Sequence, residues 1–119
     1  AIERLEQGYI VIFGCGTGNP YFSTDTGAVL RAAEIQADIV LMAKNIDGIY
    51  DKDPRKYSDA VKYSRLSYSE ILDKKLVAYD LTATAFCAAN SIRTYAFELK
   101  DPENILRVLN GEQIGTETY

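Results

Sequence analysis

A glycine-rich loop followed by hydroxyl side chains is the stretch of this sequence best suited to chemistry. Residues 14–20 read Gly-Cys-Gly-Thr-Gly-Asn-Pro, and residues 23–26 (Ser-Thr-Asp-Thr) form a cluster of good helix N-caps. Glycines let the backbone approach a ligand closely, and the first amides of the following helix favour an anion. Side chains add further donors, namely Thr17, Asn19, Ser23 and Thr24. These residues predict a phosphate-binding loop.

Two common phosphate motifs do not describe this loop. The dinucleotide fingerprint G-x-G-x-x-G requires its third glycine where Asn19 stands if it begins at Gly14, or where Tyr21 stands if it begins at Gly16. A P-loop also fails, because no Gly-Lys-Ser/Thr follows the glycines. The two remaining interpretations are a phosphate loop of another kind and a tight strand-to-helix turn without a ligand.

The composition excludes several other kinds of site. The chain has no histidine, which removes Ser-His and Cys-His nucleophiles and most zinc sites, whereas phosphoryl transfer needs no imidazole. Cys15 and Cys87 match no metal or redox spacing, and we expect free thiols. The aspartates at 47, 51 and 53 lack the spacing of a calcium loop, so turn chemistry is the better interpretation and no protein-bound metal is expected. The net charge of −4 and the lack of a long apolar run argue against nucleic acid and membrane partners.

The first half of the chain has the pattern of a βαβ unit. The apolar run at 9–13 predicts a strand that is buried on both faces of a parallel sheet. Helical periodicity follows from 27 to 36, and a second apolar run at 39–43 predicts the next strand. Because ligands bind beyond the carboxyl ends of strands in such sheets, the loops after Phe13 and Ala43 should share one rim.

The second half begins with a polar, turn-rich stretch at 44–66 that has room for a short hairpin. The elements expected after it are a helix at 67–74 opening with a capping box, a helix at 79–90, a strand at 94–99, a helix at 102–110 and a strand at 115–119. The expected fold is a three-layer α/β/α sandwich with a mostly parallel sheet, and residues 1–119 belong to one domain.

The block at 16–25 (Gly-Thr-Gly-Asn-Pro-Tyr-Phe-Ser-Thr-Asp) resembles the UMP-site signature of bacterial UMP kinases, which have the amino acid kinase fold. The resemblance continues, in order, through the stretches 31–35, 37–41, 47–50, 53–54, 66–68, 111–112 and 115–116. It spans essentially the whole chain, and a ten-residue block with ordered motifs after it is highly specific.

The resemblance implies transfer of the γ-phosphoryl group of ATP to UMP, with Mg²⁺ accompanying ATP, in the cytoplasmic synthesis of pyrimidine nucleotides. The residues that would line UMP are Thr17, Gly18, Asn19, Pro20, Tyr21, Phe22, Ser23 and Thr24. Those that would contact ATP, at its adenine-ribose end, are Lys44, Asn45, Tyr50 and Asp53. Two of the aromatic residues, Tyr21 and Phe22, are open to a second interpretation as core packing.

The resemblance gives Asp25 the role of a catalytic residue. A carboxylate repels phosphate, so its useful roles are to hold ammonium groups in place or to help organise Mg²⁺. In the family the matching aspartate orients catalytic lysines. A plain helix N-cap or first-turn acid is the alternative, and the two roles are compatible.

Members of the family are about twice as long, and their N-terminal half carries a Lys-containing glycine loop and further UMP contacts. The sequence opens on Ala1 inside what resembles the end of a helix, which suggests a missing upstream segment. We therefore expect a C-terminal nucleotide-binding half that is incomplete and inactive alone. Its expected partner is the N-terminal half, within a homo-oligomer that is a hexamer in the family.

Other functions remain open from the sequence alone. A non-catalytic nucleotide-binding or regulatory module on the same fold is the alternative from a different class. Another amino acid kinase, of the aspartokinase or carbamate kinase type, is disfavoured by the Gly-Thr-Gly-Asn-Pro block.

Overall fold

A mixed sheet of four strands lies at the centre of the computed structural model, which describes residues 1–119. The strands are β1 (Val40–Lys44), β2 (Arg65–Leu66), β3 (Thr94–Glu98) and β4 (Thr116–Thr118). Their order in the sheet is β1-β3-β4-β2, so β1 and β2 are the edge strands. β1 and β3 run parallel in register from Val40 against Thr94 to Lys44 against Glu98, whereas β4 is antiparallel to β3 and parallel to β2.

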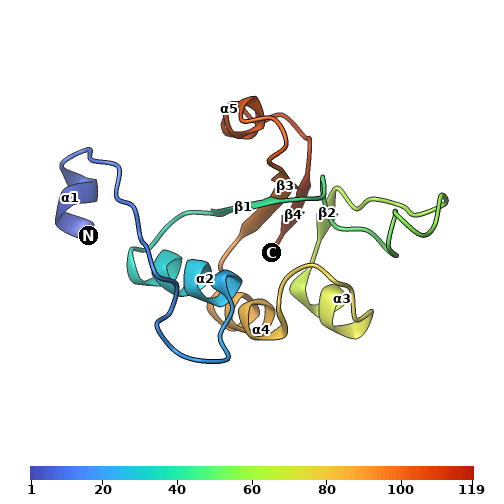
Figure 1. Cartoon of the computed structure of the whole chain (residues 1–119), viewed down its shortest axis with the longest axis horizontal. Coiled ribbons are helices and arrows are strands. Elements are labelled where there is room, and N and C mark those ends of the chain that lie inside the picture. Colours follow the sequence, from blue (N-terminus) through green and yellow to red (C-terminus); the bar gives the residue numbers. More distant parts are fainter.

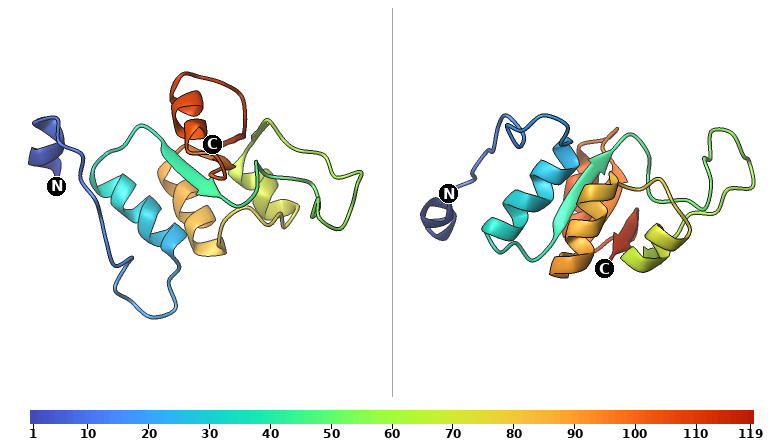
Figure 2. Two further views of the ribbon diagram at one scale, coloured as in Figure 1. Left: turned by 45° about the horizontal axis from the view of Figure 1, so that its top comes forward. Right: turned by 90° about the horizontal axis from the view of Figure 1, so that it is seen from below.

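Helices cover both faces of this sheet and make the predicted three layers. One face carries α2 (Thr24–Glu34), α3 (Tyr68–Asp73) and α4 (Leu81–Asn90), with α4 packed between the other two (Figure 1; Figure 2). The other face carries α5 (Glu103–Leu109). The short α1 (Ile2–Glu6) lies away from the sheet (Figure 1). None of the helices is long and apolar enough to cross a bilayer.

The helix starts follow from capping chemistry, largely as predicted. The capping box is confirmed at α3, where the Ser67 side chain accepts from the amide of Glu70 and the Glu70 carboxylate accepts from the amide of Ser67. Ser23 caps α2, which begins three residues before the predicted stretch because Thr24, Asp25 and Thr26 already belong to its first turn. Asp80 caps α4 through Ala83.

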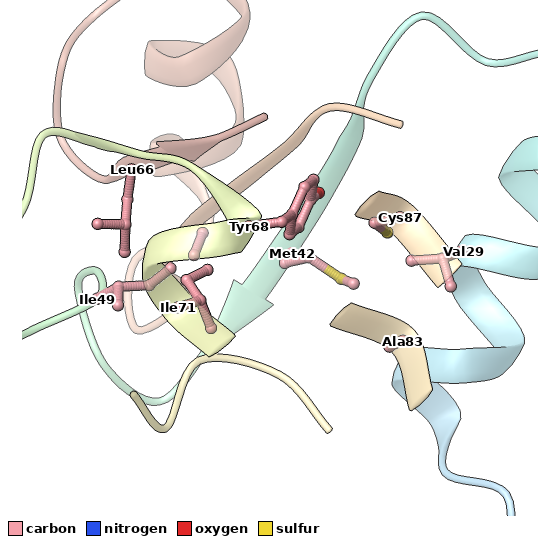
Figure 3. Close-up of a cluster of buried hydrophobic side chains, with 9 residues drawn as sticks. Val29, Met42, Ile49, Leu66, Tyr68, Ile71, Ala83 and Cys87 are labelled. Carbon is pink, nitrogen blue, oxygen red and sulfur yellow. The ribbon is translucent and has the colours of Figure 1, made fainter. Parts of the chain in front are cut away.

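The core lies between the sheet and the three helices on its first face (Figure 3). Its buried members are Val29, Met42, Ile49, Leu66, Tyr68, Ile71, Ala83, Cys87 and Ala96. Every one of α2, α3, α4, β1, β2 and β3 contributes at least one of them, which locks these elements together. The core therefore fixes α2 relative to β1, and these two elements carry the chemistry described below.

One predicted strand does not form. Residues 9–13 are extended but unpaired, and the side chains of Ile10 and Ile12 are 94% and 90% exposed. The prediction of a strand buried on both faces is therefore wrong for this structure. The physical reason is the absence of pairing, because the four strands that form hydrogen-bond only among themselves and none pairs with residues 9–13. The outer edge of β1 stays open for the same reason.

The turn before β4 depends on glycine, and this dependence is testable. A Cβ atom added at Gly115 would lie 2.1 Å from the carbonyl oxygen of Ala96, a backbone atom of β3 that cannot move aside. We expect Gly115→Ala to lower the free energy of unfolding by about 3 kcal/mol, as overpacking in a core does. Urea denaturation of the chain measures the loss.

Gly14→Ala is the matched control for this substitution. Nothing lies within 4 Å of a Cβ atom at Gly14, and its backbone is not left-handed. We expect its free energy of unfolding to stay within about 1 kcal/mol of the parent. Equal losses for the two variants would contradict the close approach of Gly115 to β3.

Candidate functional site

The glycine-rich loop has a backbone suited to anions. Its φ angles are left-handed at Cys15, Gly16, Gly18 and Tyr21, and such turns point successive amides outward. The amide of Asn19 is taken by the side chain of Thr17 at 3.1 Å. The amides of residues 14–18 and 21–25 donate no hydrogen bond within the chain. They are free to donate to a ligand, beside the positive end of α2.

The predicted UMP residues are exposed except Thr17, which is half-buried, and the last of them, Thr24, is the first residue of α2. Tyr21 is fully exposed and Phe22 is 52% exposed, so neither is part of the core of this chain. Core packing, the second interpretation of these aromatic residues, is therefore wrong here. The side chains are available for contact with a ligand or with another polypeptide.

An ion pair between Asp25 and Lys44 is the most ordered polar feature of the site. The Nζ of Lys44 lies 2.7 Å from one carboxylate oxygen of Asp25 and 2.6 Å from the other. Asp25 comes from the first turn of α2, and Lys44 is the last residue of β1, at the carboxyl end of that strand. Both side chains are about three-quarters buried, with 22% and 26% of their surface exposed. This is the rim on which the sequence predicted that the two loops would meet.

A cavity of about 520 Å³ begins directly after Lys44. Three of the four residues predicted to contact ATP line it, namely Asn45, Tyr50 and Asp53, while Lys44 instead faces Asp25. Sequence reasoning missed two further parts of the lining, the neighbours of Asp53 within 51–55 and the residues at 74–78 after α3. The wall carries Lys52, Arg55, Lys74 and Lys75 together with Asp51 and Asp53. The first three of these cations are paired with Asp59, Asp53 and Glu70, so the wall mixes both signs of charge.

Hydrogen bonds hold the wall of this cavity in place. The hydroxyl of Tyr50 donates to Asp47 at 2.8 Å, and Lys62 pairs with the second oxygen of the same carboxylate at 2.8 Å. Burial raises the pKa of the Tyr50 phenol, and the bond to Asp47 raises it further, so the phenol remains a donor at neutral pH. Burial opposes ionisation of Asp47, but the bonds from Lys62 and Tyr50 bring its pKa below the ordinary value.

The aspartates that superficially suggest a calcium loop make turn contacts. Asp51 accepts from the amide of Val61 at 2.8 Å, and Asp53 accepts from the amide of Arg55 at 3.0 Å. The bridge between Tyr50 and Lys62 makes the short hairpin that the polar stretch allowed. The turn interpretation is confirmed for Asp53, whereas Asp51 bonds across the hairpin and Asp47 bonds to the side chains of Tyr50 and Lys62.

A second, larger groove of about 780 Å³ runs from the glycine-rich loop along the open edge of β1. Its walls are mostly apolar and include Ile12, Phe13, Val40 and Leu41. The glycine-rich loop lines it at Gly14, Gly16 and Thr17, and the first residue of α2, Thr24, lies beside them. The rest of the groove is lined by α2, through Gly27, Ala28, Arg31 and Ala32, and by the edge of β1.

The fold and this site identify the class of protein to which the chain belongs. The sequence model of the amino acid kinase family matches residues 1–97, and the chain belongs to that family. Within it, the chain is 53% identical over 116 residues to the uridylate kinase of Porphyromonas gingivalis, covering 98% of this chain and 48% of that protein.

Solved structures agree with this assignment. The UMP kinase of Bacillus anthracis matches with a TM-score of 0.94 at 32% identity, covering 98% of this chain and 48% of that one. The UMP kinase of Ureaplasma parvum matches with a TM-score of 0.92 at 38% identity, covering 98% and 50%. The chain thus spans about half the length of the relatives it matches and corresponds to their C-terminal half. The predicted family and fold are confirmed.

Proposed function

We propose that this chain is the C-terminal half of a UMP kinase, which transfers the γ-phosphoryl group of ATP to UMP. The observation that carries the proposal is the Asp25–Lys44 pair, because it joins the free amides of the loop to the cavity that begins at Asn45. The identity to a uridylate kinase supports the choice of substrate.

UMP is assigned to the loop at 17–24. Its phosphate is an anion, and the loop offers unpaired amides with the hydroxyl of Thr24 beside them, whereas the hydroxyls of Thr17 and Ser23 donate within the chain to Asn19 and Asp80. The exposed Tyr21 and Phe22 are the groups nearest in sequence that offer a flat apolar face to a base.

ATP is assigned to the cavity lined by Asn45, Tyr50 and Asp53. Mg²⁺ is assigned to the substrate, as the complex with ATP, rather than to the protein. Both oxygens of Asp25 face the ammonium group of Lys44, so this carboxylate does not fit the role of a direct metal ligand. It fits the other predicted role, that of holding an ammonium group in place.

The reaction needs a cation at the transferred group. An oxygen of the UMP phosphate forms a bond to the γ-phosphorus as the bond to the ADP oxygen breaks, and charge develops on the oxygens around phosphorus. Lys44 is the cation that this chain places at the junction of the two sites, and Asp25 fixes its position. One lysine is too little for this charge, so the remaining cations are assigned to the N-terminal half that the relatives possess.

A non-catalytic nucleotide-binding module is the alternative function. The same loop and cavity support it, since binding alone does not need the cations of a second half. It predicts UMP binding that an added N-terminal half leaves unchanged.

A calorimetric titration tests the proposal. The chain is titrated with UMP, with CMP as control, and again after addition of the N-terminal half of the Porphyromonas gingivalis relative. We expect preference for UMP over CMP, and tighter binding once the added half completes the site. A folded chain that binds UMP in neither setting would show that the proposed function is wrong.

A further inference from the structure

The side chain of Asp80 contacts the starts of two helices at once. One oxygen accepts from the amide of Ala83 at 2.9 Å, which is the ordinary N-cap of α4. The same carboxylate accepts from the hydroxyl of Ser23 and from that of Thr26, the latter at 3.2 Å to each oxygen. A helix cap needs one acceptor, so the contacts to α2 go beyond capping.

The contacts from Asp80 lie on either side of Asp25. Ser23 is the N-cap of α2 and Thr26 its third residue, so Thr24 and Asp25 are held between two tethered neighbours. The carboxylate of Asp25 reaches Lys44 from this same turn. The direction in which Asp25 points thus depends on how the turn is held.

The neighbouring residue supports the other member of the pair. The ring of Tyr79 lies 5.6 Å from the Nζ of Lys44, and its hydroxyl accepts from Thr94 at 2.9 Å. Thr94 is fully buried in β3 and also accepts from the hydroxyl of Tyr68 at 3.1 Å. Tyr79 is therefore anchored to β3 beside Lys44, and the next residue, Asp80, contacts the two neighbours of Asp25 in α2.

The negative charge of the Asp80 carboxylate suits its position between the N-termini of α2 and α4. Burial opposes its ionisation, but bonds from Ser23, the amide of Ala83 and Thr26 hold its pKa below the ordinary value. The ionised carboxylate lies at the positive ends of α2 and α4 together. Asparagine would keep the cap of α4 but offers only one oxygen acceptor in place of two.

We propose that Asp80 is a positioning residue of this site, which sets the first turn of α2 so that Asp25 meets Lys44. It does not touch the reacting groups itself. The inference rests on the proposed function for its catalytic consequence, but the positioning itself is a property of this chain.

Amide hydrogen exchange of the 119-residue chain tests the positioning directly. In Asp80→Asn we expect the amides of Thr26 and Gly27, which bond to Ser23, to exchange about tenfold faster. Ser67→Ala is the matched control, because it removes a cap from α3 and leaves α2 untouched. Unchanged exchange at both amides in Asp80→Asn would overturn the proposal.

Kinetics of the chain reconstituted with the N-terminal half of the relative test the consequence. We expect Asp80→Asn to lower kcat by about 10- to 100-fold, as a small misplacement of a catalytic group does, while Ser67→Ala stays near the parent. Thr26→Val should act through the same contact, so that adding it to Asp80→Asn lowers kcat no further. Effects that multiply, or a kcat within twofold of the parent, would contradict the positioning role.

The two tests separate two kinds of failure. A parent assembly that forms no UDP would argue against the proposed kinase function, yet exchange at Thr26 and Gly27 would still decide whether Asp80 holds the turn. Faster exchange with unchanged kcat would show that the turn is held for stability alone.

Discussion

Replacing Asp25 by asparagine is expected to lower kcat for UDP formation by about 10²–10³-fold in the assembly of this chain with an N-terminal half. Both oxygens of Asp25 contact the Nζ of Lys44, and the pair is about three-quarters buried, so little water is present to hold the ammonium group instead. The neutral amide has one oxygen and an NH₂ group that repels the ammonium group. Lys44 then loses its fixed position at the transferred phosphoryl group. Steady-state kinetics with UMP and ATP varied in turn measure the loss.

Two further variants make this test specific. Lys44→Met should lower kcat by a similar factor, and the double variant should be no worse than either single one, because each removes the same unit. Glu34→Gln breaks an ion pair of the same length, with Arg31, at the far end of the same helix and should change kcat little. If Asp25→Asn keeps kcat within tenfold of the parent, the pair is structural and the catalytic assignment is wrong.

The sequence was informative where local chemistry decides structure. The capping box at Ser67 and Glu70 and the proline before α5 each lie within one turn of the helix start that they mark. The apolar run at 39–43 located β1, which the structure places at Val40–Lys44.

Contacts between distant residues could not be predicted in this way. Asp80 lies 57 residues from Ser23, and its sequence context predicts only an N-cap. Lys44 was expected beside the nucleotide, but that its partner would be Asp25, 19 residues away, follows only from how α2 packs on β1. The hydrophobic pattern of a sequence indicates which face of a helix or strand is buried. It does not indicate which two faces pack against each other.

The stretch at 9–13 shows a different limit. Its apolar character predicted a strand buried on both faces, yet in this chain the segment is extended and exposed. A strand forms only where partners supply hydrogen bonds, and the sequence of the strand itself does not say whether they are present. This apolar segment borders a groove along the open edge of β1, so an apolar segment and an unpaired strand edge lie uncovered side by side.

The chain alone is expected to form no UDP, and formation of UDP is expected when the N-terminal half of the Porphyromonas gingivalis relative is added. The relatives are about twice the length of this chain, and we expect an N-terminal half of a relative to pack on the apolar groove beside residues 9–13. Ile12→Lys should leave the stability of the lone chain unchanged, since Ile12 is 90% exposed, but it should block the gain in activity because a lysine would become buried. Leu109→Lys, at a residue that is 66% exposed on α5, is the matched control and should permit the gain. UDP formed by the lone chain would contradict its predicted dependence on a second half, and equal gains for the two lysine variants would place the docking surface elsewhere.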